Sequence, residues 1–314
     1  MLFILNVDNY KRGREEMDNI ILKYQKAFNS LMNKMKPSEN ILAVMVFGSM
    51  VTGDFWEESD IDLFVILKDY SNEIKNIYTE EKGVAVHIKL MSKEKFLQLH
   101  ESDLRGGFIH RIFASSRLVF SKDLDVTTRY NNGRYYPDLD RERWNMVYLG
   151  KTLKSIDVCK KYLSNDGIYV AYSTAIRAIE DFARLYVNCN GYMISKDATS
   201  MAMNINDEFK ECVDKLFFSK EDSVKIVQET LDFLNSSVDK NIKESTRLLL
   251  EFMRIKDDLL SAEEIKNDPL FESYEIDMED ILNELWKNNL VKKDFRNYND
   301  LKGNYIIKEN VYFI

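Results

Sequence analysis

The segment of residues 44–67 constrains the fold most, because two apolar runs in it enclose a short polar loop. The first run ends in Gly48-Ser49, and the second begins with Asp60-Ile61-Asp62. Successive side chains of a strand point to opposite faces, so Asp60 and Asp62 share one face while Ile61 points into the core. The segment therefore predicts two neighbouring strands, with paired carboxylates at the start of the second.

The chemistry of these residues favours a site for metal-bound phosphates. Two carboxylates placed two residues apart can converge on one hard cation, and Mg²⁺ is typically held by one or two carboxylates together with substrate phosphates. Gly48 lets backbone N–H groups approach a phosphate without a Cβ in the way, and Ser49 adds a hydroxyl donor. A β-hairpin with an acidic rim is the alternative, but it explains neither the Gly-Ser pair nor two acids facing one way.

The order of apolar strand, Gly48-Ser49, short loop and Asp60-Ile61-Asp62 resembles the signature of the DNA polymerase β-like nucleotidyltransferase superfamily. The resemblance implies that Asp60 and Asp62 hold Mg²⁺ or Mn²⁺. It further implies a nucleoside triphosphate substrate, ATP in the first place, with Gly48, Ser49 and Ser59 as nucleotide-binding residues. In layout the chain looks closest to the aminoglycoside (kanamycin) nucleotidyltransferase-like proteins, in which a helical domain follows the catalytic domain.

A further predicted strand, residues 84–90, is expected to present Ala85, His87 and Lys89 on the face that a catalytic strand would use. Relatives usually place a third carboxylate on this strand, and the resemblance puts His87 at that position. His87 could act as a general base, since an unperturbed imidazole pKa of about 6.5 suits that role near neutrality. It could equally be a strand histidine that forms a hydrogen bond at a domain seam.

Nearby acids could replace the missing carboxylate, or they could be solvated loop charges. These acids are Asp54, Glu57, Glu58, Glu80 and Glu81. His110 and Arg111 could likewise contact a triphosphate or lie at the surface. Around the site the sequence predicts helices near residues 9–36, 73–79 and 92–99 and a last strand at residues 117–123.

The length of 314 residues exceeds what one ordinary core accommodates, and only three prolines and eleven glycines favour helix over much of the chain. We predict an α+β protein of three domains. They are a nucleotidyltransferase domain with a mixed sheet and flanking helices at residues 1–128, an α-helical bundle for the acceptor substrate at 129–262, and a winged-helix-like helix-plus-hairpin module at 263–314. Within the bundle the predicted helices end near residues 164, 188 and 218, and a fourth, 222–252, has a possible break at 234–237.

The resemblance also implies a catalytic acid in the helical domain, because the aminoglycoside enzymes use one there to deprotonate the drug hydroxyl. Glu180 and Asp181 are the candidates. The alternative is that both are solvated helix charges or ion-pair partners of Arg177 and Arg184.

Charge and cysteine content exclude some classes of protein. A net charge of −8 argues against non-specific binding of duplex DNA and suits a cationic acceptor. The three cysteines, Cys159, Cys189 and Cys212, are widely spaced and favour reduced thiols over a disulfide or zinc site. The apolar start is too short for a signal peptide or a membrane span, so we expect a cytoplasmic location and no membrane partner.

Together these features predict a metal-dependent nucleotidyltransferase that moves a nucleoside monophosphate, AMP in the first place, from a nucleoside triphosphate to a hydroxyl of a small molecule. An aminoglycoside-like antibiotic is the analogous acceptor, which would imply a role in antibiotic resistance. Two alternatives remain open. One is a catalytically impaired nucleotide-binding or regulatory protein that lacks the third carboxylate. The other is nucleotide transfer to protein or RNA. Apart from this RNA alternative, nucleic acid is not an expected partner. Whether the chain forms a homodimer stays open.

Overall fold

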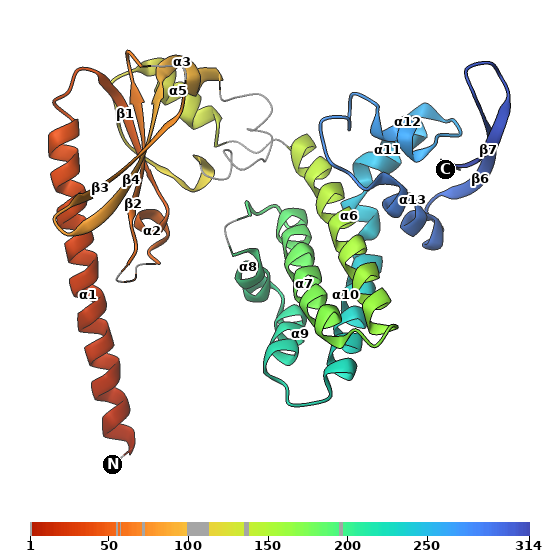
Figure 1. Cartoon of the computed structure of the whole chain (residues 1–314), viewed down its shortest axis with the longest axis horizontal. Helices are drawn as coiled ribbons and strands as arrows, with labels where there is room; N and C mark the ends of the chain where they lie inside the picture. The colour runs from red at the N-terminus through yellow and green to blue at the C-terminus, as the bar shows by residue number, and fades with distance from the viewer. Residues whose placement is uncertain are drawn as a thin grey trace. The chain divides into compact units, whose positions relative to one another are not determined.

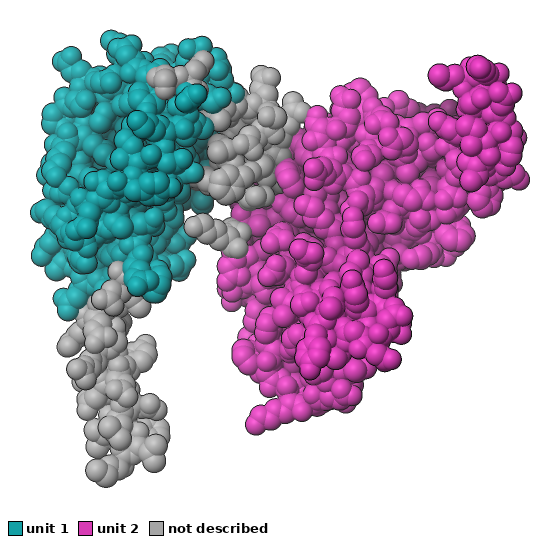
Figure 2. Space-filling model, viewed as in Figure 1, with its two compact units in different colours: residues 1–136 teal, residues 137–314 magenta. Residues whose placement is uncertain are grey.

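The computed structural model describes residues 2–54, 56, 58–70, 73–98, 113–134, 138–194 and 197–314. The chain divides into two compact units, residues 1–136 and 137–314, shown in different colours in Figure 2. Among the described helices, none combines the length and apolar character that crossing a membrane requires. The predicted α+β class is confirmed, with a mixed sheet in unit 1 and a mainly helical unit 2.

Unit 1 is built around a five-stranded sheet of order β3-β4-β2-β1-β5 (Figure 1). Strands β2 and β4 are parallel, and the other neighbours are antiparallel. The strands are β1 Ile41–Phe47, β2 Ile61–Leu67, β3 Lys75–Glu81, β4 Val84–Ser92 and β5 Arg117–Ser121. The helices are α1 Leu2–Met35, α2 Ser49–Thr52, α3 Lys93–Gln98 and α5 Leu124–Asn132.

Helices cover both faces of this sheet. On one face, Tyr24 and Leu31 of α1 pack against a cluster that includes Ile61. On the other, Phe96 of α3 and Tyr130 of α5 belong to a second cluster with residues of β1, β2 and β4. Strands buried on both faces read as continuous apolar runs, which is why residues 41–47 and 61–67 are so hydrophobic. The polar Asp60 and Asp62 therefore mark the end of the sheet where the core stops.

The helix predicted at residues 73–79 is wrong, because this segment forms the edge strand β3. It pairs antiparallel with β4, and the two residues that connect them, Lys82 and Gly83, have φ values of 50° and 74°. Positive φ at both central residues is what a type I′ hairpin turn requires. The hairpin pairing with β4 thus determines the structure of residues 75–79.

The domain boundaries predicted from the sequence stay predictions. Helix α5 runs through residue 128, and its Val126 and Tyr130 are buried in the core of unit 1. Unit 1 therefore continues beyond residue 128.

Unit 2 begins with a helical bundle. Its helices are α6 Asp138–Leu163, α7 Ile168–Cys189, α8 Ala198–Ile205, α9 Asp207–Phe218, α10 Ser223–Ser245 and α11 Arg247–Lys256. The predicted ends near residues 164, 188 and 218 are confirmed. The break predicted at residues 234–237 is wrong, since α10 continues through them. The interruption lies instead at Thr246, whose hydroxyl donates a 2.7 Å hydrogen bond to the Ile242 carbonyl.

The last part of unit 2 is the predicted winged-helix-like segment. It comprises α12 Ala262–Lys266, α13 Met278–Lys287 and a hairpin of β6 Lys292–Asn299 and β7 Tyr305–Phe313. Tyr312 of β7 is fully buried in the same core as the bundle helices. Its hydroxyl donates to Glu279 Oε1 at 2.8 Å. The end of the hairpin that carries Tyr312 therefore packs into the core of unit 2.

Candidate active site

Three potential metal ligands meet at one end of the sheet in unit 1. Asp60 directly precedes β2, Asp62 lies on β2, and His87 lies on β4 opposite Asp62 in the parallel register. One ligand atom from each residue lies within 4.8 Å of the other two, and all three residues are half-buried. No second group of this kind occurs in the part of the chain that the structure describes. Strand alternation alone predicted that Asp60 and Asp62 lie together. In the structure His87 joins them as a third member of the group.

The imidazole of His87 is held on three sides. Its Nδ1 lies 3.2 Å from Asp62 Oδ1, and its Nε2 lies 3.1 Å from Asn76 Oδ1. The Tyr78 ring stacks on it with 4.6 Å between centroids and 7° between planes. Asn76 and Tyr78 both lie on β3, which the sequence had suggested to be helical. The Lys82-Gly83 turn was the signal that could have placed them beside His87.

Gly48 is required by two independent features of the site. It has φ 71° and ψ −148°, a conformation that is essentially restricted to glycine. A Cβ at this position would lie 2.6 Å from Asp62 Oδ2, far inside van der Waals contact. The glycine that follows β1 therefore leaves the space that the Asp62 carboxylate occupies.

The loop between β1 and β2 is folded by hydrogen bonds from serines and a tyrosine. The Ser49 hydroxyl donates to the Asp60 carbonyl at 3.3 Å, and Trp56 N–H donates to the buried Ser59 hydroxyl at 3.1 Å. Tyr24 of α1 donates to the carbonyls of Ser59 and Trp56. Burial, followed by the nearby Asp60 charge, raises the Tyr24 pKa above its usual value. Tyr24 was not among the candidate residues, although it ties the loop that carries Asp60 to α1.

Tyr24→Phe should loosen this loop while keeping the aromatic packing. Loss of hydrogen bonds to buried carbonyls is expected to lower the free energy of unfolding by about 1 kcal/mol. Binding of divalent cations by unit 1 should weaken as well, because Asp60 follows the loop directly. Denaturant unfolding and cation titration measure the two effects. Tyr70→Phe is the matched control, since Tyr70 packs on the same core and its hydroxyl forms no hydrogen bond with the described residues. Equal effects of the two substitutions would contradict the role of Tyr24.

The alternative acids do not join the cluster. Glu81 accepts hydrogen bonds from Lys34 at 2.5 Å and Ser30 at 2.7 Å, both on α1. These partners lower the pKa of Glu81. Asp54, Glu58 and Glu80 are exposed and lie outside the group of three ligands. Glu57, His110 and Arg111 lie outside the described residues.

Glu180 and Asp181 lie on α7 of unit 2, and both pair with Arg184. Glu180 is exposed and lies 3.8 Å from the guanidinium. Asp181 is buried and accepts from Ser155 at 2.8 Å and from Arg184 at 3.0 Å. Within unit 2 both residues are therefore ion-pair partners of Arg184, as the alternative interpretation of the sequence proposed. A catalytic role for Glu180 stays a prediction.

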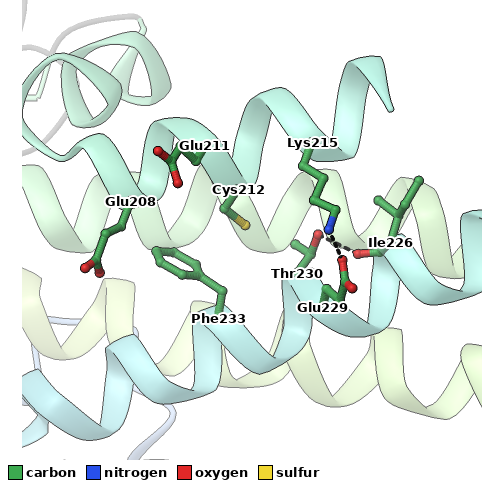
Figure 3. A pocket seen from close by; sticks show the side chains of 8 residues that line it. All are labelled: Glu208, Glu211, Cys212, Lys215, Ile226, Glu229, Thr230 and Phe233. Carbon is green, nitrogen blue, oxygen red and sulfur yellow. Dashed lines mark hydrogen bonds and ion pairs between the residues drawn. The ribbon is translucent and has the colours of Figure 1, made fainter. Parts of the chain in front are cut away.

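A separate pocket in unit 2 lies between α9 and α10 (Figure 3). Its lining combines apolar side chains such as Phe233 with glutamates, and Lys215 reaches across to Glu229 at 2.5 Å. Cys212 faces the same pocket, and burial raises its pKa to about 11. Cys159 and Cys189 have raised pKa values for the same reason. All three cysteines are free, as predicted.

The residues at the end of the sheet fit a divalent cation. Ligands about 2.1 Å from an octahedral ion lie roughly 3 Å from one another. The separation of 3.2 Å between His87 Nδ1 and Asp62 Oδ1 is close to that value. Two carboxylates and an imidazole are donors that divalent ions commonly use in proteins. The described geometry therefore accommodates a divalent cation.

Comparison with known proteins supports this interpretation of unit 1. Residues 29–125 match the family described as "Polymerase beta, Nucleotidyltransferase". The matched segment includes all five strands of the sheet together with Gly48, Asp60, Asp62 and His87. Curated proteins gave no match to the sequence.

Among solved structures, a nucleotidyltransferase-like protein from Exiguobacterium sibiricum 255-15 is similar with a TM-score of 0.61 and 15% identity, over 92% of this chain and 99% of that chain. Spectinomycin adenyltransferase AAD(9) from Enterococcus faecialis, solved with ATP and spectinomycin, has a TM-score of 0.30 and 14% identity, over 69% of this chain and 97% of that one. The second overlap is too slight to bear on fold or function. The first shows a similar fold, and the family match shows that residues 29–125 resemble the polymerase β nucleotidyltransferases.

Proposed function

We propose that this protein is a metal-dependent nucleotidyltransferase that moves a nucleoside monophosphate from a nucleoside triphosphate to a hydroxyl group of a small molecule. The observation that carries the proposal is the convergence of Asp60, Asp62 and His87 within 4.8 Å, beside the glycine turn at Gly48. The family match of residues 29–125 supports the same class of reaction.

In this proposal Asp60, Asp62 and His87 hold the cation, which when bound neutralises phosphate charge and aligns the reacting groups. Gly48 and Ser49 contact the phosphates, and Ser59 keeps the connecting loop in place. The acceptor oxygen attacks the α-phosphorus, the bond from that phosphorus to the bridging oxygen breaks, and pyrophosphate leaves. Positioning and charge stabilisation are most of what such transfer asks of a protein.

The proton of the acceptor hydroxyl needs a base, and His87 is poorly suited to that task. Both of its ring nitrogens already face partners, Asp62 and Asn76, and its ring is stacked beneath Tyr78. Glu180 of unit 2 remains our candidate for the base. Its contact with Arg184 is a partly exposed ion pair, of a kind that contributes little stability and exchanges easily.

We propose ATP as the donor and a hydroxyl of a cationic, aminoglycoside-like molecule as the acceptor. The choice of ATP follows the analogy with the aminoglycoside nucleotidyltransferases, which the chain resembles in layout. The net charge of −8 supports a cationic acceptor. These features support the substrate class and leave the individual acceptor to experiment.

A second candidate is a protein that binds the nucleotide without transferring it. It is favoured by the imidazole of His87 at the place where a third carboxylate is expected, since no other acid joins the cluster among the described residues. Under this candidate the nucleotide stabilises the fold, but no pyrophosphate appears.

One experiment separates the two candidates. The full chain is incubated with labelled ATP, GTP, CTP or UTP, a divalent cation, and a panel of aminoglycosides, lincosamides or cell extract. The transferase proposal expects acceptor-dependent release of pyrophosphate and label on a small molecule. Label on protein or RNA from the extract would change the acceptor class. Binding of the nucleotide without pyrophosphate under every condition would refute transfer and support the second candidate.

A further inference from the structure

We propose that His87 is a nitrogen ligand of the cation, and that the site consequently prefers divalent transition ions to Mg²⁺. The inference rests on the proposed function, since it concerns the same cation. It extends that function by naming Nδ1 of His87 as the donor atom and by assigning the class of ion. The argument uses the position of His87, the orientation of its ring and the chemistry of the donor set.

The position of His87 follows from the sheet. Parallel pairing of β2 and β4 places His87 directly beside Asp62, and both side chains are 16% exposed. The ring therefore lies next to the carboxylates, and neither strand has to move for all three side chains to reach one ion. A ligand supplied by a central strand is also more precisely placed than one supplied by a loop.

The orientation of the ring is set by β3. Asn76 Oδ1, which can only accept, lies 3.1 Å from Nε2 and so favours the tautomer that carries its proton on Nε2. In that tautomer Nδ1, the nitrogen that faces Asp62, can offer its lone pair to an ion. Histidines that bind metals almost always donate their other ring N–H to such an acceptor. The parallel stack of Tyr78 on the imidazole, with 7° between the planes, opposes rotation of the ring. Asn76 and Tyr78 are thus positioning residues for His87.

The donor set then differs from the all-oxygen set that suits Mg²⁺. Mg²⁺ is bound mainly by carboxylates, water and phosphates, whereas imidazole favours first-row transition ions, whose affinity for a given site rises from Mn²⁺ to Co²⁺. Asp60 and Asp62 supply oxygen and His87 supplies nitrogen. The expected order of affinity is therefore Mg²⁺ below Mn²⁺ and Mn²⁺ below Co²⁺.

Calorimetric titration of the full chain with MgCl₂, MnCl₂ or CoCl₂ alone tests this order. Loss of an outer-shell partner typically costs about 10–100-fold in metal affinity, and a ligand should matter at least as much. His87→Asp should therefore lower the affinity for Co²⁺ by at least about tenfold while keeping or raising that for Mg²⁺. Asn76→Ala should weaken Co²⁺ binding about tenfold, whereas Asn76→Asp, which retains an oxygen acceptor, should not.

Electron spin-echo spectroscopy of the Mn²⁺-loaded chain supplies a readout that folding defects cannot imitate. Nitrogen coupling is expected in the native chain and in His100→Asn and His110→Asn, which alter the other two histidines, and it should vanish in His87→Asp. Bound Mn²⁺ without nitrogen coupling, or equal affinity for Mg²⁺ and Co²⁺, would overturn the inference and leave the proposed function standing. Nitrogen coupling in a chain that never releases pyrophosphate would support His87 as a ligand and contradict the proposed transfer reaction.

Discussion

Replacing either aspartate of the cluster by asparagine is expected to reduce nucleotide transfer by about 10³-fold, because cation-mediated charge stabilisation is worth several kcal/mol and each 1.36 kcal/mol is a factor of ten. Asp60→Asn and Asp62→Asn keep the size of the side chain, remove its charge and replace one acceptor oxygen with an NH₂ donor. The same substitutions should abolish the cation-dependent rise in melting temperature that a nucleoside triphosphate produces. Pyrophosphate release and thermal unfolding measure the two effects.

Asp69→Asn is the matched control for this pair. Asp69 follows the opposite end of β2 and is exposed, so its neutralisation changes the total charge equally without touching the cluster. We expect native activity and a native melting shift in that variant. A full melting shift in Asp60→Asn would contradict the cation role of the cluster, whereas loss of activity in Asp69→Asn would point to a non-specific effect of charge.

Gly48→Ala is expected to damage both stability and cation binding. The backbone conformation at Gly48 should cost a residue with a Cβ about 1–3 kcal/mol. The new methyl group must in addition displace the Asp62 carboxylate, whose Oδ2 would lie 2.6 Å away. Since Asp62 is a proposed ligand, the affinity for cations should fall together with the free energy of unfolding.

Gly53→Ala separates these two costs. Gly53 also has a positive φ, 82°, but a Cβ there meets nothing within 4 Å. Its substitution should therefore lower the free energy of unfolding by about 1 kcal/mol through the backbone alone and leave cation binding unchanged. Denaturant unfolding and cation titration of both variants provide the comparison. If Gly48→Ala bound cations as tightly as Gly53→Ala does, the proposed contact between the glycine turn and Asp62 would be wrong.

The centre of unit 1 could be predicted from the sequence because its signals are local. Strand alternation was enough to put Asp60 and Asp62 on one face and Ile61 in the core, as the structure confirms. The alternation of residues 84–90 likewise placed His87 on the face of the acids. Each of these inferences depends only on the period of a strand and on burial, which a single segment reveals.

The surroundings of His87 could not be predicted because they depend on pairing between segments. Asn76 and Tyr78 reach the imidazole only because Lys75–Glu81 joins the sheet edge. Its exposed, charged composition gives little sign of a strand. Tyr24 contacts the loop before Asp60 across 35 residues of sequence, a contact that helical periodicity cannot indicate. The position of the break after α10 was missed for a similar reason, since packing in the bundle carries the helix through Asn235 and Ser236.

The central claim is that Asp60, Asp62 and His87 together hold one divalent cation. Anomalous diffraction from crystals of the full chain grown with MnCl₂ and a non-hydrolysable ATP analogue tests it most directly. The account predicts one strong manganese peak within bonding distance of a carboxylate oxygen of each aspartate and of His87 Nδ1, with the analogue's phosphates beside Gly48. A well-ordered cluster with no manganese peak between these side chains would contradict it.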